Sequence, residues 1–175
     1  MAKSPALYKS DVLEELMSYF DRVFRICLGF SKNPWDAEEL MQEVYLRALR
    51  KIVTLKNTDV SKEWLFRIAR NTCLNYVKRQ RLHHILRHKM NIDSVEHNTP
   101  ERKVIQKEQH QAFKKAVSQL PKKQRLVFIL KEYAHLSYNE IAATLRIKEG
   151  TVMSRLNRAR HAIITKLKEE NHAKP

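Results

Sequence analysis

The sequence predicts an all-α protein with two small helical domains joined by a flexible linker, the C-terminal domain carrying a helix-turn-helix. Only two glycines and five prolines occur in 175 residues, which disfavours a turn-rich β fold and suits helices. Apolar residues recur at helical spacing along most of the chain, and a polar stretch of mixed charge interrupts them. We therefore expect domains at residues 1–90 and 105–175, joined by a linker at 91–104.

Three helices are predicted for the first domain. Apolar residues at helical spacing predict a helix over residues 10–29, and the segment 31–34, which ends in proline, breaks it. A second helix is expected over about 35–52, because acidic residues in its first turns complement the helix dipole. After a polar loop, a third helix spans about 62–81 and continues toward residue 90.

The second domain is predicted to be helical as well. Helical spacing returns near Glu101 and continues to Leu120, and Pro121 starts another helix at a position that tolerates proline. The segment 136–160, LSYNEIAATLRIKEGTVMSRLNRAR, predicts a helix-turn-helix. Its apolar residues lie at the spacings that pack two short helices across a tight turn: Ile141, Ala142, Leu145, Ile147 and Val152.

The distribution of charge predicts two anion-facing surfaces. The chain carries 34 Lys plus Arg against 19 Asp plus Glu, a formal net charge of +15. Residues 1–63 hold ten basic and ten acidic side chains, whereas residues 64–90 hold seven Lys or Arg, three His and no acid. Residues 111–175 hold 14 basic and five acidic side chains. This balance favours nucleic acid as the partner, since the sequence contains no long apolar run.

Few residues suggest catalytic or metal chemistry. Cys27 and Cys73 form no CxxC pair and predict buried thiols in a reducing cytosol. The trio His83, His84 and His88 lacks the further ligands of a zinc site, and no nucleotide-binding glycine loop occurs. The N-terminus shows no signal peptide. We therefore expect a cytoplasmic protein that is not an enzyme, inserts in no membrane and needs no metal or cofactor.

The predicted third helix has two distinct faces. A narrow apolar face should be core: Leu65, Ile68, Ala69, Thr72 and Tyr76. The neighbouring face holds the residues that we assign to nucleic-acid contact: Arg67, Asn71, Asn75 and Lys78. Amides donate and accept hydrogen bonds at base edges, while cations hold phosphates. A merely solvated face is the alternative, but the absence of any acid from residue 64 to residue 90 argues against it.

The second helix of the helix-turn-helix is predicted to enter a DNA major groove. Its buried stripe should be Val152, Leu156, Ala159 and Ile163. The residues that we assign to DNA contact lie at its start or away from that stripe: Thr151, Met153, Ser154, Arg155, Asn157 and Arg158. Arg146 occupies the turn position where many such motifs use glycine to adopt a positive φ. A helical hairpin without a DNA role is the alternative.

Acidic side chains cluster at the start of the predicted second helix. We assign four of its polar residues to protein docking: Asp36, Glu39, Gln42 and Glu43. Metal-dependent nuclease sites need carboxylates that converge from separate elements. A cluster on one helix is more typical of a helix start combined with a docking face.

Segments along the chain resemble, in the same order, parts of the extracytoplasmic-function (ECF) family of bacterial RNA polymerase sigma factors. Residues 33–48, NPWDAEELMQEVYLRA, resemble the core-binding segment of that family. Residues 64–72, WLFRIARNT, resemble its promoter-melting and −10-reading helix. Residues 120–128, LPKKQRLVF, and the helix-turn-helix resemble its −35-reading domain. The similarity covers roughly residues 10–82 and 105–168.

The resemblance implies an alternative sigma factor, which binds core RNA polymerase and directs transcription initiation at promoters with −10 and −35 elements. The first domain would be region 2-like and the second region 4-like. The acidic cluster matches positions that dock on the β′ clamp helices, and the C-terminal domain would also contact the β flap. Asn71 and Asn75 match the face that captures unpaired −10 bases, and Arg158 lies on the helix that enters the −35 groove. An anti-sigma factor is the usual regulatory partner in this family.

Two other functional classes stay open on the sequence alone. A stand-alone helix-turn-helix transcriptional regulator would bind duplex operators without polymerase and would dimerise. A small nuclease or recombinase would cleave DNA in a metal-dependent way.

Overall fold

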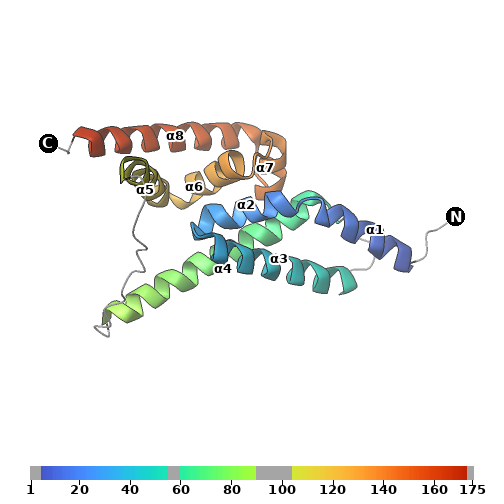
Figure 1. Ribbon diagram of the computed structural model, residues 1–175. Helices are drawn as coiled ribbons and strands as arrows, with labels where there is room; N and C mark the ends of the chain where they lie inside the picture. Colours follow the sequence, from blue (N-terminus) through green and yellow to red (C-terminus); the bar gives the residue numbers. More distant parts are fainter. Residues whose placement is uncertain (1–4, 55–59, 90–103, 173–175) are drawn as a thin grey trace.

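The computed structural model describes residues 5–54, 60–89 and 104–172, and these form helices joined by short turns (Figure 1). No strand occurs in these three ranges, which confirms the all-α fold class. Most of the predicted linker and the loop at 55–59 lie outside them. The elements in chain order are α1 (Pro5–Met17), α2 (Phe20–Ser31), α3 (Pro34–Thr54), α4 (Lys62–Lys89), α5 (Val104–Gln119), α6 (Lys122–Phe128), the π-helical η1 (Ile129–Tyr133), α7 (Tyr138–Leu145) and α8 (Glu149–His172).

The prediction of one helix over 10–29 is wrong, because α1 and α2 are separated by a turn at Ser18 and Tyr19. The Tyr19 N–H donates to the Leu16 carbonyl (3.2 Å) in this turn. The Tyr45 hydroxyl from α3 donates to the same carbonyl at 3.0 Å. The apolar periodicity hid the break because residues on both sides of it are buried in the same core.

The N-terminal core forms where α2, α3 and α4 pack together. Each helix contributes fully buried apolar side chains, among them Ile26, Val44 and Phe66. The predicted core face of α4 is confirmed from Leu65 to Thr72, whereas Tyr76 is only half-buried and uses its hydroxyl elsewhere. Truncation of a buried aromatic such as Phe66 to alanine costs about 3–5 kcal/mol, so this core is what holds α3 and α4 in a fixed relation.

The predicted helix-turn-helix is present as α7 and α8. Ser137 and Glu140 form a capping box at the start of α7, since each side chain accepts a hydrogen bond from the backbone N–H of the other. Arg146 ends α7 in the left-handed conformation with φ 54°, as expected for a turn position that often carries glycine. The Ile147 N–H donates to the Ala142 carbonyl (3.0 Å) and closes the turn that leads into α8.

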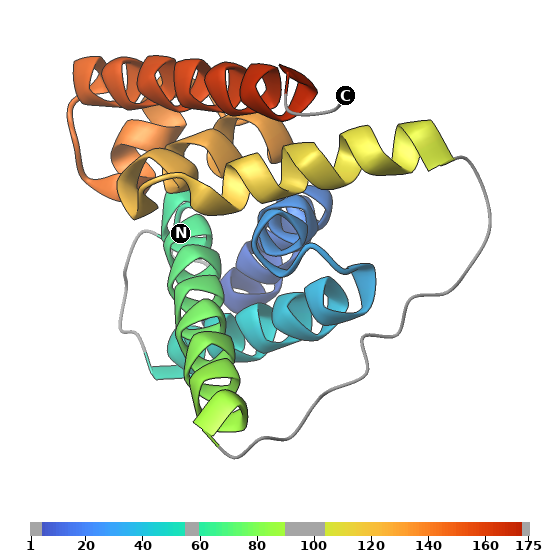
Figure 2. The same ribbon diagram turned by 90° about the vertical axis from the view of Figure 1, so that its left-hand side faces the viewer.

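The two halves of the chain pack against each other, which the sequence did not reveal. Contacts join α2 to η1 and α4 to α7, so the C-terminal helices lie along the N-terminal three-helix core (Figures 1 and 2). Gly29 allows helix α2 to approach the Ile129 side chain of η1 closely. A Cβ atom placed on it would lie 2.5 Å from Cγ2 of Ile129, whose side chain is fully buried in η1. We call this packing of the two halves the closed arrangement.

Replacing Gly29 with valine should weaken the closed arrangement by about 1–3 kcal/mol, because the added carbon atoms overlap a fixed side chain. Chemical denaturation should show the lower stability, and small-angle scattering should show a larger radius of gyration. Gly150→Ala is the matched control, since a Cβ at Gly150 meets nothing within 4 Å. Equal stability and equal dimensions for Gly29→Val and the wild-type protein would contradict this packing.

Candidate polymerase and nucleic-acid interfaces

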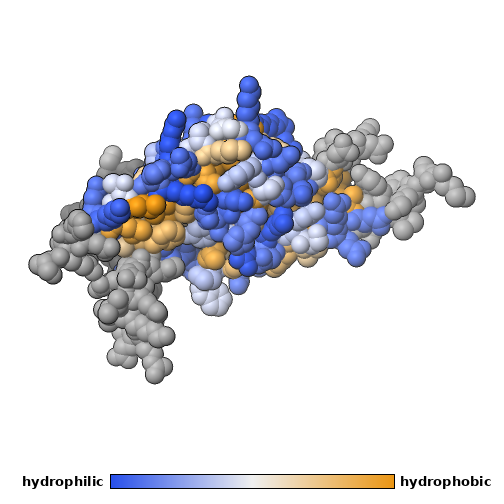
Figure 3. Space-filling view, turned by 90° about the horizontal axis from the view of Figure 1, so that it is seen from above, coloured by the Kyte–Doolittle hydropathy of each residue, from blue (hydrophilic) through white to orange (hydrophobic). Residues whose placement is uncertain are grey.

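Helix α8 presents a polar face to solvent because its apolar stripe is buried. The predicted stripe is confirmed, with Val152, Leu156, Ala159 and Ile163 at most 4% exposed. It packs on α5, α6 and α7, so α8 lies on the side of the molecule away from the N-terminal helices (Figure 1). Seen from above in Figure 3, hydrophilic residues cover most of the described surface on this side.

The predicted DNA-contact residues of α8 lie on or beside this outer face. Met153, Ser154, Asn157 and Arg158 are exposed, while Thr151 and Arg155 are half-buried at its edges. Arg160, on the same helix, binds Glu132 of η1 through a 2.6 Å ion pair. The outer face of α8 therefore offers amide, hydroxyl and guanidinium groups at one surface, as major-groove readout requires.

Glu140 connects the helix-turn-helix to the N-terminal half. Its side chain is 12% exposed and forms ion pairs with Arg22 of α2 (3.0 Å) and Lys62 of α4 (2.8 Å). Burial alone would raise its pKa, but hydrogen bonds from Lys62 and Ser137, together with the Lys62 charge, lower the pKa of Glu140 to about 2. The capping residue of α7 is thus also the main polar contact of the closed arrangement.

The depressed pKa of Glu140 predicts a pH dependence of stability. A carboxyl group whose pKa falls from 4.5 to about 2 on folding stabilises the protein above pH 4.5 and loses this effect as the pH drops toward 2. Glu140→Gln should cost about 1–2 kcal/mol near neutral pH, because solvent screens part of the attraction. The difference from wild type in urea unfolding should therefore narrow as the pH falls from about 4.5 toward about 2. A difference that stays constant over this range would contradict the ion-pair assignment.

On the face of α4 assigned to nucleic acid, three of the four predicted residues are exposed to solvent. Asn71, Asn75 and Lys78 are exposed, and Arg67 is half-buried. Arg70 donates to the Asn71 side-chain oxygen from Nε (3.1 Å) and Nη2 (2.8 Å). This bond orients the Asn71 amide so that its nitrogen is left to donate to a ligand. Sequence reasoning missed Arg70, although its place next to Asn71 in a stretch without acids, residues 64–90, was a usable signal.

Positive charge accumulates around this face. Burial, followed by the charges of Arg67 and Arg146, lowers the pKa of the Arg70 guanidinium. Arg146 belongs to the turn of the helix-turn-helix, so the closed arrangement brings cations of both halves together. Uncompensated cations of this kind are favourable only next to an anion, which supports a nucleic-acid interface on this side of α4.

The four residues of α3 that are predicted to dock on a protein partner form two pairs, which differ in their contacts within the protein. Glu39 and Gln42 are exposed and available to a partner. Asp36 instead accepts a hydrogen bond from the Tyr76 hydroxyl (2.8 Å), and Glu43 pairs with Arg47 (2.6 Å). Burial and this bond to Asp36 raise the pKa of Tyr76 to about 12.

The Asp36–Tyr76 hydrogen bond ties the acidic face of α3 directly to α4. A cavity of about 400 Å³ lies beside it, and both helices line it. Three of the predicted docking residues share this cavity with guanidinium and imidazole groups from α3 and α4: Asp36, Glu39 and Glu43, with Arg47, Arg79 and His83. A hydrogen bond and a shared cavity thus join the docking candidates on α3 to α4.

Apolar side chains extend the α3 surface beyond the predicted residues. Trp35 is 77% exposed, Leu46 is 51% exposed and Leu49 is 39% exposed. At about 100° per residue, all three fall on the same side of α3 as Glu39 and Gln42. The apolar character of Leu46 and Leu49 did not indicate that they lie outside the core. Exposed apolar groups next to polar ones are typical of a protein-binding surface.

No metal or membrane site is found in the described part of the chain. Within it, no three His, Cys, Asp or Glu side chains lie close enough together to hold a metal ion. The side chains of His84 and His88 fall outside that part. Among the helices described, none is both long and apolar enough to span a bilayer. Cys27 and Cys73 are fully buried thiols with sulfur atoms 3.8 Å apart.

Comparison with known proteins places both halves in one family. Residues 16–83 match Sigma-70 region 2, and residues 110–163 match Sigma-70, region 4. The ECF RNA polymerase sigma-E factor of Escherichia coli K12 is 31% identical over 75% of this chain and 74% of its own length. The ECF RNA polymerase sigma factor SigE of Mycolicibacterium smegmatis is 32% identical over 86% of this chain, which spans 59% of that relative's length.

A solved structure supports the same relationship. The sigma factor RpoE from Bartonella quintana, determined in complex with the anti-sigma factor NepR, aligns with a TM-score of 0.62 at 26% identity. The alignment covers 90% of this chain and 97% of that one. With two sigma regions in the expected order and a sigma-E relative matched over most of its length, the chain belongs to the ECF family of RNA polymerase sigma factors.

Proposed function

We propose that this alternative sigma factor divides its task among three helices. The exposed face of α3, with Glu39 and Gln42 at its centre, binds the β′ clamp helices of core RNA polymerase. The face of α4 that carries Asn71 and Asn75 captures −10 bases of the unwound strand. The outer face of α8 reads the −35 element in the major groove.

The observation that carries this proposal is the separation of the three surfaces. Each lies on a different helix, and each has the chemistry its ligand needs: carboxylate with apolar groups on α3, amide with cations on α4, and amide with guanidinium on α8. We assign Asp36 and Glu43 to the support of the α3 face, and Arg67 and Lys78 to phosphate contact on α4. On α8, we assign direct or flanking DNA contact to Thr151, Met153, Ser154, Arg155, Asn157 and Arg158.

We further propose a domain division at 1–90 and 105–175, with 91–104 as the tether. The tether would let polymerase hold the two domains at the separation of the promoter elements, which raises the effective concentration of the second contact. The C-terminal domain would also bind the β flap. This role is not catalytic, because specificity comes from DNA contacts while the polymerase carries the chemistry. It places the protein in the cytoplasm, where the polymerase acts.

An anti-sigma factor is the proposed regulatory partner. The Bartonella relative was solved bound to one, and the two chains align over most of their lengths. Such a partner would compete with polymerase or promoter DNA for the surfaces on α3, α4 and α8.

Transcription in a purified system tests the proposed function. Core RNA polymerase plus this protein should initiate at a reproducible subset of a genomic promoter library, and those promoters should share two elements at fixed spacing. Core enzyme alone is the control. Random initiation in both reactions would overturn the proposal.

A further inference from the structure

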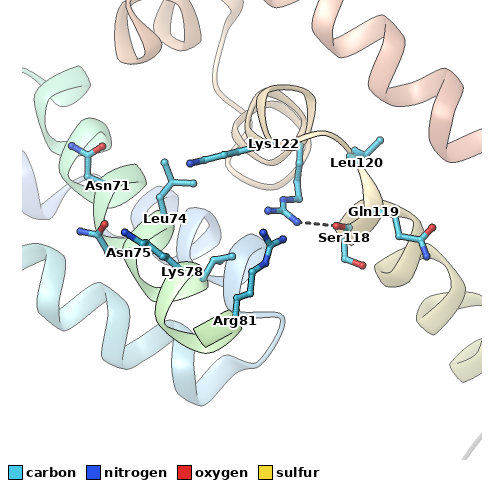
Figure 4. Close-up of a pocket in the computed structure, with 11 residues that line it drawn as sticks. Asn71, Leu74, Asn75, Lys78, Arg81, Ser118, Gln119, Leu120 and Lys122 are labelled. Carbon is cyan, nitrogen blue, oxygen red and sulfur yellow. Dashed lines mark hydrogen bonds between the residues drawn. The ribbon is translucent and has the colours of Figure 1, made fainter. Parts of the chain in front are cut away.

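A basic groove lies between the two halves of the closed arrangement. It has a volume of about 780 Å³ and is lined on one side by α4 and on the other by the end of α5 and the start of α6 (Figure 4). The wall from α4 includes Asn71, Asn75, Lys78 and Arg81. We call this space the interdomain groove.

The charges that line the interdomain groove are all positive. Lys78 and Arg81 stand on one wall, Lys122 and Arg125 stand on the other, and the lining contains no Asp or Glu. The Arg81 side chain extends from α4 into this space in Figure 4. One Arg125 nitrogen, Nη1, donates to the Ser118 carbonyl (2.8 Å), which fixes the guanidinium at the rim.

The closed arrangement thus places like charges opposite one another. Burial, then the charge of Arg81, lowers the pKa of Arg125. Lys32, at the end of α2, shows the same effect: burial, then Arg125 and Lys114, lower its pKa. Repulsion of this kind destabilises the closed arrangement unless an anion lies between the cations. Arginine pairs suit phosphate best, because their planar forks match its oxygen atoms.

We propose that the free protein binds a single strand of nucleic acid in the interdomain groove, with phosphates between Arg81 and Arg125 and bases against Asn71 and Asn75. This inference rests on the proposed role of α4, and it adds residues of the C-terminal half to that site. The strand would hold the two halves together without polymerase. Once polymerase separates the domains, Lys122 and Arg125 leave the strand and α4 alone keeps it.

Two features favour nucleic acid over an acidic peptide as the occupant. The α4 wall carries two amides followed by two cations, so one strand can satisfy base edges and phosphates along the same helix. Asn71 is already oriented by Arg70 to present its amide nitrogen as a donor. An acidic peptide would also pair with the cations, but it lacks the flat base edges that asparagine amides can read.

Binding of short fluorescent oligonucleotides to the free protein tests this inference. Single-stranded DNA and RNA of equal length should both bind, and duplex DNA of that length should bind more weakly, since its stacked bases cannot reach Asn71 and Asn75. The Arg81→Gln, Arg125→Gln double variant should raise Kd about tenfold, because two charge-assisted contacts are lost. The slope of log Kobs against log salt should become shallower by about 1.4, from about 0.7 per phosphate contact.

Matched variants distinguish binding in the interdomain groove from non-specific attraction to the positive charge of the whole protein. Lys123→Gln with Lys168→Gln removes the same charge from exposed positions outside the groove, and its Kd should change far less. Lys78→Gln with Lys122→Gln should weaken binding like the arginine pair. Lys78 and Lys122 are exposed, so their replacement should leave folding unchanged. This second pair therefore shows whether weaker binding by the arginine variant comes from lost contacts or from a folding defect at half-buried Arg125.

Three results would overturn the inference. The first is equal loss of binding in the outside-groove control and the arginine variant. The second is no loss in either groove variant. The third is a poly-glutamate peptide that displaces the oligonucleotide and depends on the same arginines, which would make the groove an acidic-peptide site. Run-off transcription by the Arg125→Gln single variant with core polymerase should persist, because Arg125 leaves the strand when polymerase separates the domains; a failure of this inference therefore differs from a failure of the proposed function.

Discussion

Introducing lysine at both Glu39 and Gln42 is expected to abolish copurification of this protein with core RNA polymerase. Both side chains are exposed and take no part in the core of α3, so the free protein should fold as before. Facing like charges across an interface costs several kcal/mol, which corresponds to a loss of affinity of about 100-fold or more. Circular dichroism and thermal unfolding of the variant should match those of the wild-type protein.

The choice of residues in that experiment depends on the structure. Asp36 accepts a hydrogen bond from Tyr76 of α4, and Glu43 pairs with Arg47 within α3, so changing either residue removes a contact inside the protein. Glu169→Lys, at an exposed position on α8, is the control for added positive charge. Retention of polymerase by the Glu39 and Gln42 variant at wild-type level would reject α3 as the docking surface.

Arg158→Ala is expected to weaken recognition of the upstream promoter element. The side chain lies exposed on the outer face of α8, where a base-reading arginine contributes about 1–3 kcal/mol of discrimination. Holoenzyme carrying the variant should therefore distinguish wild-type from mutated −35 elements about 10- to 100-fold less well in run-off transcription.

Two further measurements serve as controls for the Arg158→Ala experiment. Lys168→Ala, near the far end of the same helix, should leave the discrimination ratio unchanged. Polymerase binding by Arg158→Ala should also stay at the wild-type level, because α3 is untouched. If the variant transcribes both upstream elements at the wild-type ratio, Arg158 does not read DNA.

Helix periodicity predicted the fold well where each helix has one buried stripe. The stripe of α8 and the core face of α4 follow from spacing alone, because burial of apolar side chains dominates the energetics of these helices. The break between α1 and α2 escaped prediction because buried residues on its two sides, such as Leu16 and Val23, keep a helical spacing. The turn at Arg146 was recognisable, since its place between two short helices demands a positive φ.

The packing of the two halves could not be predicted from the sequence. It depends on the close approach at Gly29 and on the ion pairs of Glu140, which join residues more than 70 positions apart in the chain. In the sequence, neither a glycine within a helix nor a glutamate in a capping box indicates a contact with the other half of the chain. Only the three-dimensional arrangement shows that both also serve contacts between the halves. The same holds for the interdomain groove, whose walls come from α4 and α6.

Binding of intact duplex promoter DNA by the free protein and by its holoenzyme, compared at one salt concentration, tests the central claim most directly. The claim is that two helical domains read a two-part promoter only when polymerase holds them apart. We predict specific, salt-sensitive binding by the holoenzyme and no sequence preference by the free protein on duplex DNA. Tight, specific duplex binding by the free protein, unchanged when core polymerase is added, would contradict the claim.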